Sequence, residues 1–276
     1  MTDTPPRPAD IRLIAVDMDG TLLDGDGRIP DSLWPLLERL DQRGIAFVPA
    51  SGRPLATLRA LFGEAGARMT FIAENGTHVV RGEDEISTDA LDPDFVRMVV
   101  ERVRTLAADG HDLGIVLCGK ETAHIERADA PFRAEVDTYY VQVAEHADVL
   151  SADDVILKLA VFDFVSAEQS AAPALADIAA THQVVVSGRH WVDVMNKGIN
   201  KGVALAELQQ SLGIDRAHTA AFGDYLNDLE MLDAADWSFA MADAHEDVAA
   251  RARYRAPSNR DHGVITTIED LLFSAS

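Results

Sequence analysis

The chain of 276 residues carries 46 Asp and Glu against 24 Lys and Arg, which gives it a formal net charge of −22 at pH 7. A surface this acidic repels phosphate backbones and anionic lipid headgroups, so the composition argues against a nucleic-acid-binding or membrane-bound protein. The only cysteine, Cys118, excludes an internal disulfide, and the polar N-terminal stretch MTDTPPRPAD does not resemble a signal peptide. These features predict a cytoplasmic protein in which any anionic substrate needs a local cation.

The first predicted element is a buried strand over residues 11–16. Its residues are apolar apart from Arg12, as expected of a central parallel strand that helices cover on both faces. The strand ends at Asp17 and Asp19, and open α/β sheets bind their ligands at the carboxyl ends of their strands. Gly20 then allows the backbone a tight turn. On its own, this stretch could equally be a strand followed by an ordinary Asp-Gly turn.

The chain then repeats this order of strand, polar residues and helix. After a first helix, a second buried strand is predicted over 45–50 and a third over 70–73. The second strand ends in Ser51-Gly52-Arg53, before a helix that starts at Pro54, and the third ends in Glu74-Asn75-Gly76. Three such strand–helix units in a row predict a doubly wound, Rossmann-like parallel sheet of the α/β class.

From residue 84 the pattern changes. Residues 83–94 are acidic and rich in turn formers, which predicts a linker. Two candidate hairpins follow, and hairpins imply antiparallel pairing that the first 80 residues do not show. We therefore predict an inserted α+β domain over residues 84–190, between two halves of the parallel core, residues 1–83 and 191–276. The elements expected in the insert are helices over 95–108, 134–140 and 166–180 and strands over 113–118, 121–126, 155–164 and 183–187. The last of these forms a candidate hairpin with a strand over 191–195, which begins the second half of the core.

After residue 196 the first pattern returns. A helix is predicted over 201–212, followed by a strand over 219–222 that ends in the polar run 223–228. The carboxyl ends of parallel strands meet at one edge of a sheet, so the candidate functional side chains are expected to converge there. These side chains are Asp17, Asp19, Ser51, Lys201, Asp224 and Asp228.

The remaining elements predicted in the second half of the core are a helix over 229–235, a strand over 237–241 and a helix over 248–253.

The order and spacing of these residues resemble the haloacid dehalogenase superfamily of phosphotransferases over essentially the whole chain. Asp17–Thr21 matches its first motif, Ser51 the second, Lys201 the third and the run 223–228 the fourth. An insert between the second and third motifs resembles its C2 type of cap. The stretches that favour the Cof-type subfamily are Ser51-Gly52-Arg53, Glu74-Asn75-Gly76, Asn200-Lys201-Gly202, Ala240-Met241 and Asp261-His262-Gly263-Val264.

The resemblance implies a Mg²⁺-dependent phosphomonoester hydrolase that acts on a small phosphorylated metabolite, with sugar phosphates among the candidates. In the family mechanism, Asp17 attacks phosphorus and forms an aspartyl-phosphate intermediate. Asp19 protonates the leaving alcohol and then deprotonates the hydrolytic water. Carried over by motif, Ser51 donates to a phosphate oxygen and Lys201 is the catalytic cation.

A metal site is indicated by the same residues. Four carboxylates around one pocket repel each other strongly, and a site of hard oxygen ligands completed by water and phosphate suits Mg²⁺. The metal ligands implied by the motifs are Asp17, the Asp19 backbone carbonyl and Asp224, with Asp228 close by or bound through water. The residues expected beside the phosphate are Gly52, Arg53 and Asn227.

Some positions allow a second interpretation. Ser51 could only cap the helix that follows it, and Asp228 could only offset a helix dipole. Asp243 stands where the subfamily often has Asn, and it could alter specificity or begin the next helix. Either Lys197 or Lys201 could be the third-motif lysine. Lys201 is favoured because it stands at the start of a helix, where a cation opposes the helix dipole. A lysine in this unfavourable position indicates that neighbouring anions require it.

The cap carries no motif that names a substrate. Four cap residues could touch substrate, although each is a surface or packing residue by default: Arg127, Tyr139, Arg189 and His190. Arg189 and His190 are the first choices because they lie beside the return to the core. Two other functions use clustered aspartates: a phosphomutase, which returns phosphate to an alcohol, and a non-catalytic phosphoacceptor module. No sequence feature fixes the oligomeric state.

Overall fold

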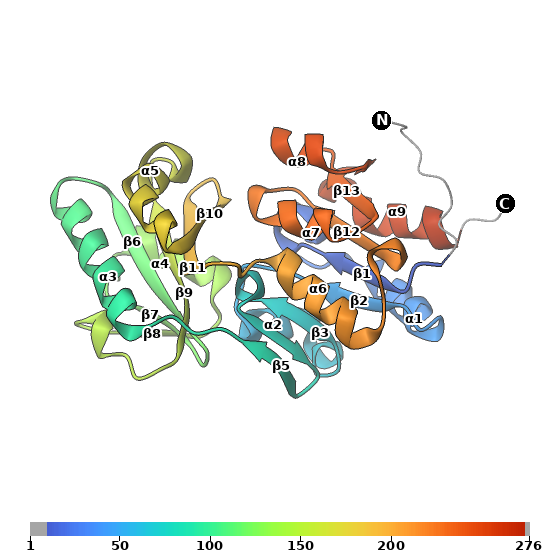
Figure 1. Ribbon diagram of the computed structural model, residues 1–276, viewed down its shortest axis with the longest axis horizontal. Helices are drawn as coiled ribbons and strands as arrows, with labels where there is room; N and C mark the ends of the chain where they lie inside the picture. The colour runs from blue at the N-terminus through green and yellow to red at the C-terminus, as the bar shows by residue number, and fades with distance from the viewer. Residues whose placement is uncertain (1–9, 274–276) are drawn as a thin grey trace.

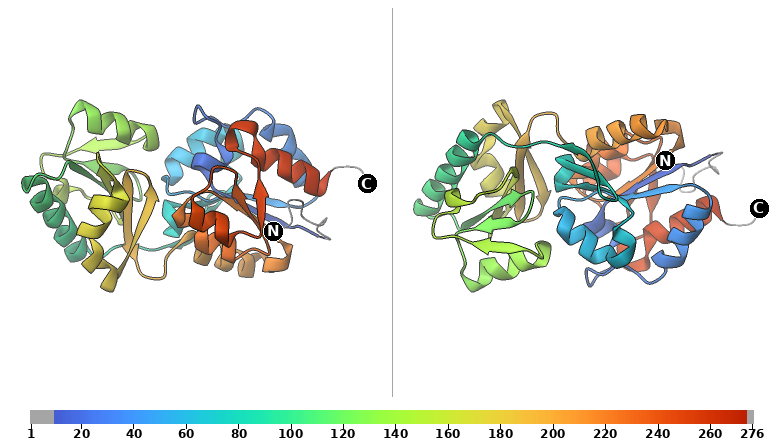
Figure 2. Two further views of the ribbon diagram at one scale, coloured as in Figure 1. Left: turned by 90° about the horizontal axis from the view of Figure 1, so that it is seen from above. Right: turned by 90° about the horizontal axis from the view of Figure 1, so that it is seen from below.

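The computed structural model describes residues 10–273 as two units that lie side by side, the core on the right of Figure 1 and the inserted unit, called the cap below, on the left. Two chain segments cross between the units, one before and one after the insert (Figure 2). Within residues 10–273, no helix combines the length and the apolar character needed to cross a bilayer.

The centre of the core is a parallel sheet in which β1 lies between β2 and β12. Side chains of β1 alternate between its two faces: Leu13 and Ala15 join one hydrophobic cluster, and Ile14 and Val16 join the other. Helices cover both faces, which confirms the predicted doubly wound α/β fold. The strands, in spatial order, are β14 (Tyr254–Ala256), β13 (Trp237–Met241), β12 (Thr219–Gly223), β1 (Leu13–Val16) and β2 (Ala46–Pro49). The helices are α1 (Leu33–Gln42), α2 (Leu55–Gly66) and α9 (Gly263–Leu272) on one face and α6 (Lys201–Leu212), α7 (Leu229–Asp233) and α8 (Glu246–Arg251) on the other.

The third predicted strand is confirmed, but the α-helix predicted to follow it is wrong. Strand β3 (Thr70–Ala73) does run beside β2, through a parallel bridge between Ala50 and Ile72. No helix follows, because the backbone turns at Glu74 and Asn75, whose φ angles are 49° and 55°. This turn leads into an antiparallel sheet of β3, β4 (His78–Arg81) and β5 (Asp84–Thr88), so the first part of the chain does contain a hairpin.

The cap is a six-stranded sheet with helices on both faces, and both predicted hairpins are confirmed. Its strands, in spatial order, are β10 (His182–Gly188), β11 (Trp191–Asn196), β9 (Ile156–Asp163), β6 (Leu113–Gly119), β7 (Ala123–Ile125) and β8 (Val143–Glu145). Its helices are α3 (Pro93–Ala108), α4 (Ala130–Tyr139) and α5 (Ala172–Ala174).

The long helix predicted over 166–180 is broken into three short pieces. A wide turn over Ala167–Ala171 precedes α5, and a 3-10 turn over Ala176–Ala180 follows it. Pro173 lies at the break, where it lacks the N–H group that would continue the α-helical hydrogen bonding. The alanine content favoured a continuous helix, but one proline outweighs it.

The sheet pairing moves both predicted domain boundaries. Strand β5 falls in the segment predicted as a linker, yet it pairs with β4 of the core. Strand β11, predicted to begin the second half of the core, pairs with β9 and β10 of the cap. We therefore propose that the cap extends from the end of β5 to the end of β11.

Candidate active site

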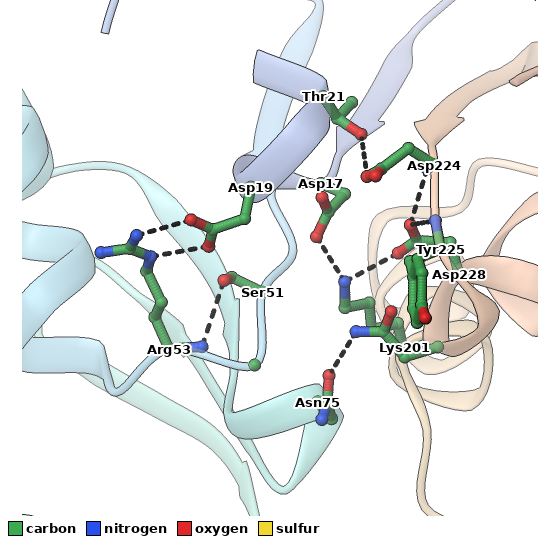
Figure 3. A network of polar contacts seen from close by, with 12 residues as sticks. Asp17, Asp19, Thr21, Ser51, Arg53, Asn75, Lys201, Asp224, Tyr225 and Asp228 are labelled. Carbon is green, nitrogen blue, oxygen red and sulfur yellow. Dashed lines mark hydrogen bonds and ion pairs between the residues drawn. The ribbon is translucent and has the colours of Figure 1, made fainter. Parts of the chain in front are cut away.

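Two aspartates meet where β1 and β12 end. Asp17 follows β1, and its backbone N–H donates to the carbonyl of Phe222 on β12 at 3.0 Å. Asp224 follows β12 directly. This pairing fixes the two carboxylates beside each other, and Asp228 joins them from the start of α7: one oxygen from each of the three lies within 4.8 Å of the others (Figure 3).

Lys201 supplies the cation for this cluster. Asn200 caps α6 by accepting a hydrogen bond from the N–H of Val203 at 2.8 Å, which places Lys201 at the first position of the helix. The fully buried ammonium donates to Asp17 Oδ1 at 2.5 Å and to Asp228 Oδ1 at 2.7 Å. Burial alone would lower the pKa of Lys201, but the two carboxylates raise it above its ordinary value.

Lys197, the alternative third-motif lysine, lies elsewhere. Its side chain is exposed, and Nζ donates to the carbonyl of Ala180 in the cap at 2.6 Å. The geometry therefore favours Lys201.

Asp224 is held close to the turn that follows β1. Thr21 donates its hydroxyl to Asp224 Oδ1 at 2.8 Å. Gly20 has a φ of +79°, and a Cβ at this position would lie 2.3 Å from Asp224 Oδ2, so only glycine permits the approach. Burial and the charge of Asp228 raise the pKa of Asp224 to about 7, and the same two causes raise the pKa of Asp17 well above its usual range.

The donor set fits a hard divalent cation such as Mg²⁺. Asp17 and Asp224 each use one oxygen for the contacts with Lys201 and Thr21, which leaves each a second oxygen for a cation. Asp228 differs, because its Oδ1 accepts from Lys201 and its Oδ2 accepts from the N–H groups of Asp224 and Tyr225 at 2.9 and 3.2 Å. With both oxygens engaged, Asp228 suits a supporting position behind the ligands rather than direct coordination.

The Ser51–Arg53 loop lies across the cavity from the aspartate cluster. Arg53 binds Asp19 through two hydrogen bonds, from Nε to Oδ2 at 2.7 Å and from Nη2 to Oδ1 at 2.5 Å. It also donates to the carbonyl of Thr138 in the cap at 3.1 Å. Ser51 Oγ accepts the N–H of Arg53 at 3.1 Å, and α2 has no side-chain cap, so the alternative role of Ser51 as a helix cap is wrong.

These residues line a cavity of about 260 Å³ between core and cap. The cap contributes Arg189 and Tyr139 among others, whereas His190 is turned elsewhere: its ring bonds the carbonyl of Asp163 at 2.7 Å and does not line the cavity. The predicted site residues on the cavity wall are Asp17, Asp19, Ser51, Gly52, Arg53, Asp224 and Asn227. Lys201 and Asp228 lie behind the wall, against Asp17.

Two further candidates lie away from the cavity wall. Arg127 pairs with Asp112 and Asp129 on the cap surface. Asp243 accepts a hydrogen bond from Ser258 at 2.7 Å, and it does not begin α8, which His245 caps.

Three cavity or support residues were missed in the sequence. Thr21 was quoted within a motif but given no role. Lys158 and Asp193 are the only charges in the interiors of the strands β9 and β11, and both line the cavity. A lone charge in an otherwise apolar strand is the signal that could have found them, because burying it requires a partner.

Residues 14–268 match the family model described as haloacid dehalogenase-like hydrolase. The chain belongs to this family. The resemblance expected from the motifs, and the prediction of a phosphatase of this family, are confirmed.

Several relatives match over nearly their whole length. One is the 5-amino-6-(5-phospho-D-ribitylamino)uracil phosphatase YbjI of Escherichia coli (strain K12), 32% identical over 95% of this chain and 96% of the relative. Another is the HMP-PP phosphatase of Enterobacter sp. (strain 638), 32% identical over 84% of this chain and 85% of the relative. The crystal structure of SMU.1108c from Streptococcus mutans UA159 superposes with a TM-score of 0.89 at 27% identity, over 96% of this chain and 100% of that one.

Proposed function

We propose that the protein is a Mg²⁺-dependent phosphomonoester hydrolase that acts on a small phosphorylated metabolite through an aspartyl-phosphate on Asp17. The observation that carries the proposal is the buried Asp17, held by Lys201 and facing Asp224 at the wall of the cavity between core and cap. A cavity of about 260 Å³ is of a size that suits a small molecule. Relatives at 32% identity are named for small phosphorylated substrates, which supports the same class here. The lone, buried Cys118 supports a place of action in the reducing cytoplasm.

The proposed first step is a displacement at phosphorus. Lys201 holds the Asp17 carboxylate, one oxygen of which attacks phosphorus while the bond from phosphorus to the alcohol oxygen breaks. Asp19 gives its proton to the departing alcohol. In the second step, Asp19 takes a proton from water, the water oxygen attacks phosphorus, and Asp17 is released with inorganic phosphate.

Arg53 would regulate when Asp19 is ready for this step. In the structure both oxygens of Asp19 accept hydrogen bonds from Arg53, so Asp19 must turn away from Arg53 and take up a proton from solvent before it can act as the acid. A substrate phosphate offers the guanidinium a competing anion, and this exchange would free Asp19 when the substrate arrives.

Mg²⁺ fits beside the second oxygens of Asp17 and Asp224. When bound, it would neutralise the crowded carboxylates and screen the charge of the incoming phosphate. Ser51 and the Gly52 backbone would hold the phosphate from the opposite side, where both line the cavity.

The test is phosphate release from a panel of phosphorylated metabolites, with Mg²⁺ and with EDTA. We expect hydrolysis that EDTA abolishes and Mg²⁺ restores. Transfer of the phosphate to a second alcohol instead of water would identify a phosphomutase, and a long-lived phosphorylated protein without turnover would identify a phosphoacceptor module.

A further inference from the structure

A second cluster of buried charges lies between core and cap, apart from the catalytic aspartates. Its centre is Lys158 on β9 of the cap, with Nζ 2.8 Å from Glu74 Oε2 of the core and 3.3 Å from Asp193 Oδ2 of the cap. All three side chains are at most 3% exposed. Such burial is expensive for any charge that lacks a partner, so the cluster is stable only as a set.

The same ammonium contacts the Ser51–Arg53 loop, which is proposed to hold the phosphate. Lys158 Nζ donates to the carbonyl of Gly52 at 2.6 Å, and Gly52 directly follows Ser51. Asn75 extends the contact, because its amide donates to Asp193 and its Oδ1 accepts from Asn227 at 3.0 Å. One cap lysine is thereby connected to both sides of the site at which the phosphate is expected.

The charge balance of the cluster depends on cap closure. Lys158 and Asp193 belong to the cap, and Glu74 belongs to the core, so opening the cap separates Glu74 from its cation. Among residues 10–273 no other ammonium or guanidinium forms an ion pair with Glu74. Burial alone would lower the pKa of Lys158, but the carboxylates of Asp193 and Glu74 raise it above its ordinary value, so the lysine stays charged in the closed form.

We propose that Lys158 is a positioning residue of the phosphatase, which completes the phosphate site when the cap closes by pairing with Glu74 and fixing the Gly52 carbonyl. This inference rests on the proposed function. Lys158 acts through the Ser51–Arg53 loop and does not react itself. Without its ammonium, the closed form buries two carboxylates with no cation, and the cap opens.

The decisive experiment compares Lys158→Met, Glu74→Gln and the double variant. Activity on p-nitrophenyl phosphate is measured as kcat and KM, and the radius of gyration is measured by small-angle scattering. We expect Lys158→Met to lower kcat/KM at least about 30-fold and to enlarge the protein, because one partner of a buried ion set has been removed. Glu74→Gln alone is expected to cost less than about fivefold, and adding it to Lys158→Met to recover at least about fivefold.

Controls separate this role from the alternatives. Lys197→Met, an exposed lysine near the domain junction, is expected to stay within about twofold of wild type. The variant Glu74→Gln/Asp193→Asn lacks both carboxylate partners of Lys158, so in this background the ammonium itself is the unpaired charge. Adding Lys158→Met there is expected to lower kcat/KM less than about threefold. This background also gives the answer should Lys158→Met alone fail to fold.

Two results would overturn the proposal. One is a loss of kcat/KM in Lys158→Met that adding Glu74→Gln does not relieve, which would indicate direct contact of Lys158 with phosphate. The other is a Lys158→Met variant with wild-type activity. If the wild type hydrolyses nothing, the proposed function fails, and scattering still decides the role of Lys158 in closure. An unchanged radius in Lys158→Met would then reject it.

Discussion

Within residues 10–273, two buried lysines are each held between two carboxylates, and the two lysines differ in where their partners lie. Lys201 and both its anions, Asp17 and Asp228, belong to the core, so their contacts persist whether the cap is open or closed. Lys158 has one anion on its own domain and one on the other. The first cluster is therefore preorganised within one domain, as transition-state stabilisation requires, whereas the second forms only where cap and core meet.

Removing Asp17, the proposed nucleophile, is the strongest way to break the preorganised cluster. Asp17→Asn keeps the shape and much of the hydrogen bonding but removes the attacking charge. We expect turnover to fall by at least about 10⁴-fold, as happens when a covalent nucleophile is lost. Phosphate release at saturating substrate measures the loss, and circular dichroism checks the fold. Appreciable hydrolysis by folded Asp17→Asn would contradict the covalent mechanism.

The next largest effect is expected at Lys201. Lys201→Ala deletes a fixed charge beside Asp17, and losses of about 10²–10³-fold in kcat are typical for such groups. Lys197→Ala, the matched control on the surface, should stay within about tenfold of wild type. Both variants are measured in one assay at saturating substrate. The reverse ranking would move the third motif to Lys197.

Asp228→Asn sharpens the contrast between ligands and supporting residues. Because Asp228 orients Lys201 and the Asp224 backbone, its amide variant is expected to weaken Mg²⁺ binding about 10–100-fold, the usual cost of a lost supporting contact. Titration of activity against Mg²⁺ concentration measures the change. Glu74→Gln, the same kind of neutralisation in the interface cluster, should leave the Mg²⁺ dependence unaltered. Equal shifts in the two variants would show that the clusters are coupled.

Stability should depend on pH and Mg²⁺ in a linked way. In the folded protein without metal, burial and Asp228 raise the pKa of Asp224 from 3.8 to about 7. The unfolded chain therefore loses this proton first as the pH rises, and the free energy of unfolding falls between about pH 4 and pH 7. Mg²⁺ compensates the ionised carboxylates, so it should raise the melting temperature by a few degrees more at pH 8 than at pH 5.

Thermal melts with EDTA and with Mg²⁺ test this, and Asp224→Asn serves as the control that should flatten the slope. The Asp224→Asn melting temperatures are subtracted from the wild-type values, both measured in EDTA. A difference that rises between about pH 4 and pH 7 would exclude the raised pKa of Asp224.

The smallest effect on the rate of phosphate-ester hydrolysis is expected at Arg189. It is exposed on the cap side of the cavity, and no salt bridge holds it within the described part of the chain. Arg189→Ala should change activity on p-nitrophenyl phosphate less than about threefold but reorder the preference among metabolites. A uniform loss on every substrate would place Arg189 in the shared machinery instead.

The sequence predicts the core well because its signals are local. Buried strands such as 219–222 end abruptly in polar residues, and those ends must meet at one edge of a parallel sheet. Strand β5 was hidden because it is an exposed edge strand, whose acidic residues read as a linker. The hairpin before it depends on a left-handed turn at Glu74 and Asn75; Asn75-Gly76 is a common turn signal, but a positive φ is rare for glutamate.

The interface cluster could not be assembled from the sequence for a different reason. Lys158, Asp193 and Glu74 come from three separate strands or turns of two domains, and nothing in their spacing links them. In the sequence, Lys158 and Asp193 are visible only as charges in apolar strands, and Glu74 only as part of the polar stretch Glu74-Asn75-Gly76. Their pairing follows from the closed packing of cap on core, which periodicity does not encode.

The insertion of the cap also bears on how the chain folds. The nucleophile and its lysine are 184 positions apart, and the central strand β1 is flanked on one side by β12 from the far end of the chain. During synthesis the cap, one continuous stretch, can fold before the second half of the core has left the ribosome. The core must wait for residues 219–223 to complete its sheet, and such long-range pairing slows folding. Until then the half-core exposes an apolar edge at β1, which makes the nascent chain a candidate for chaperone binding.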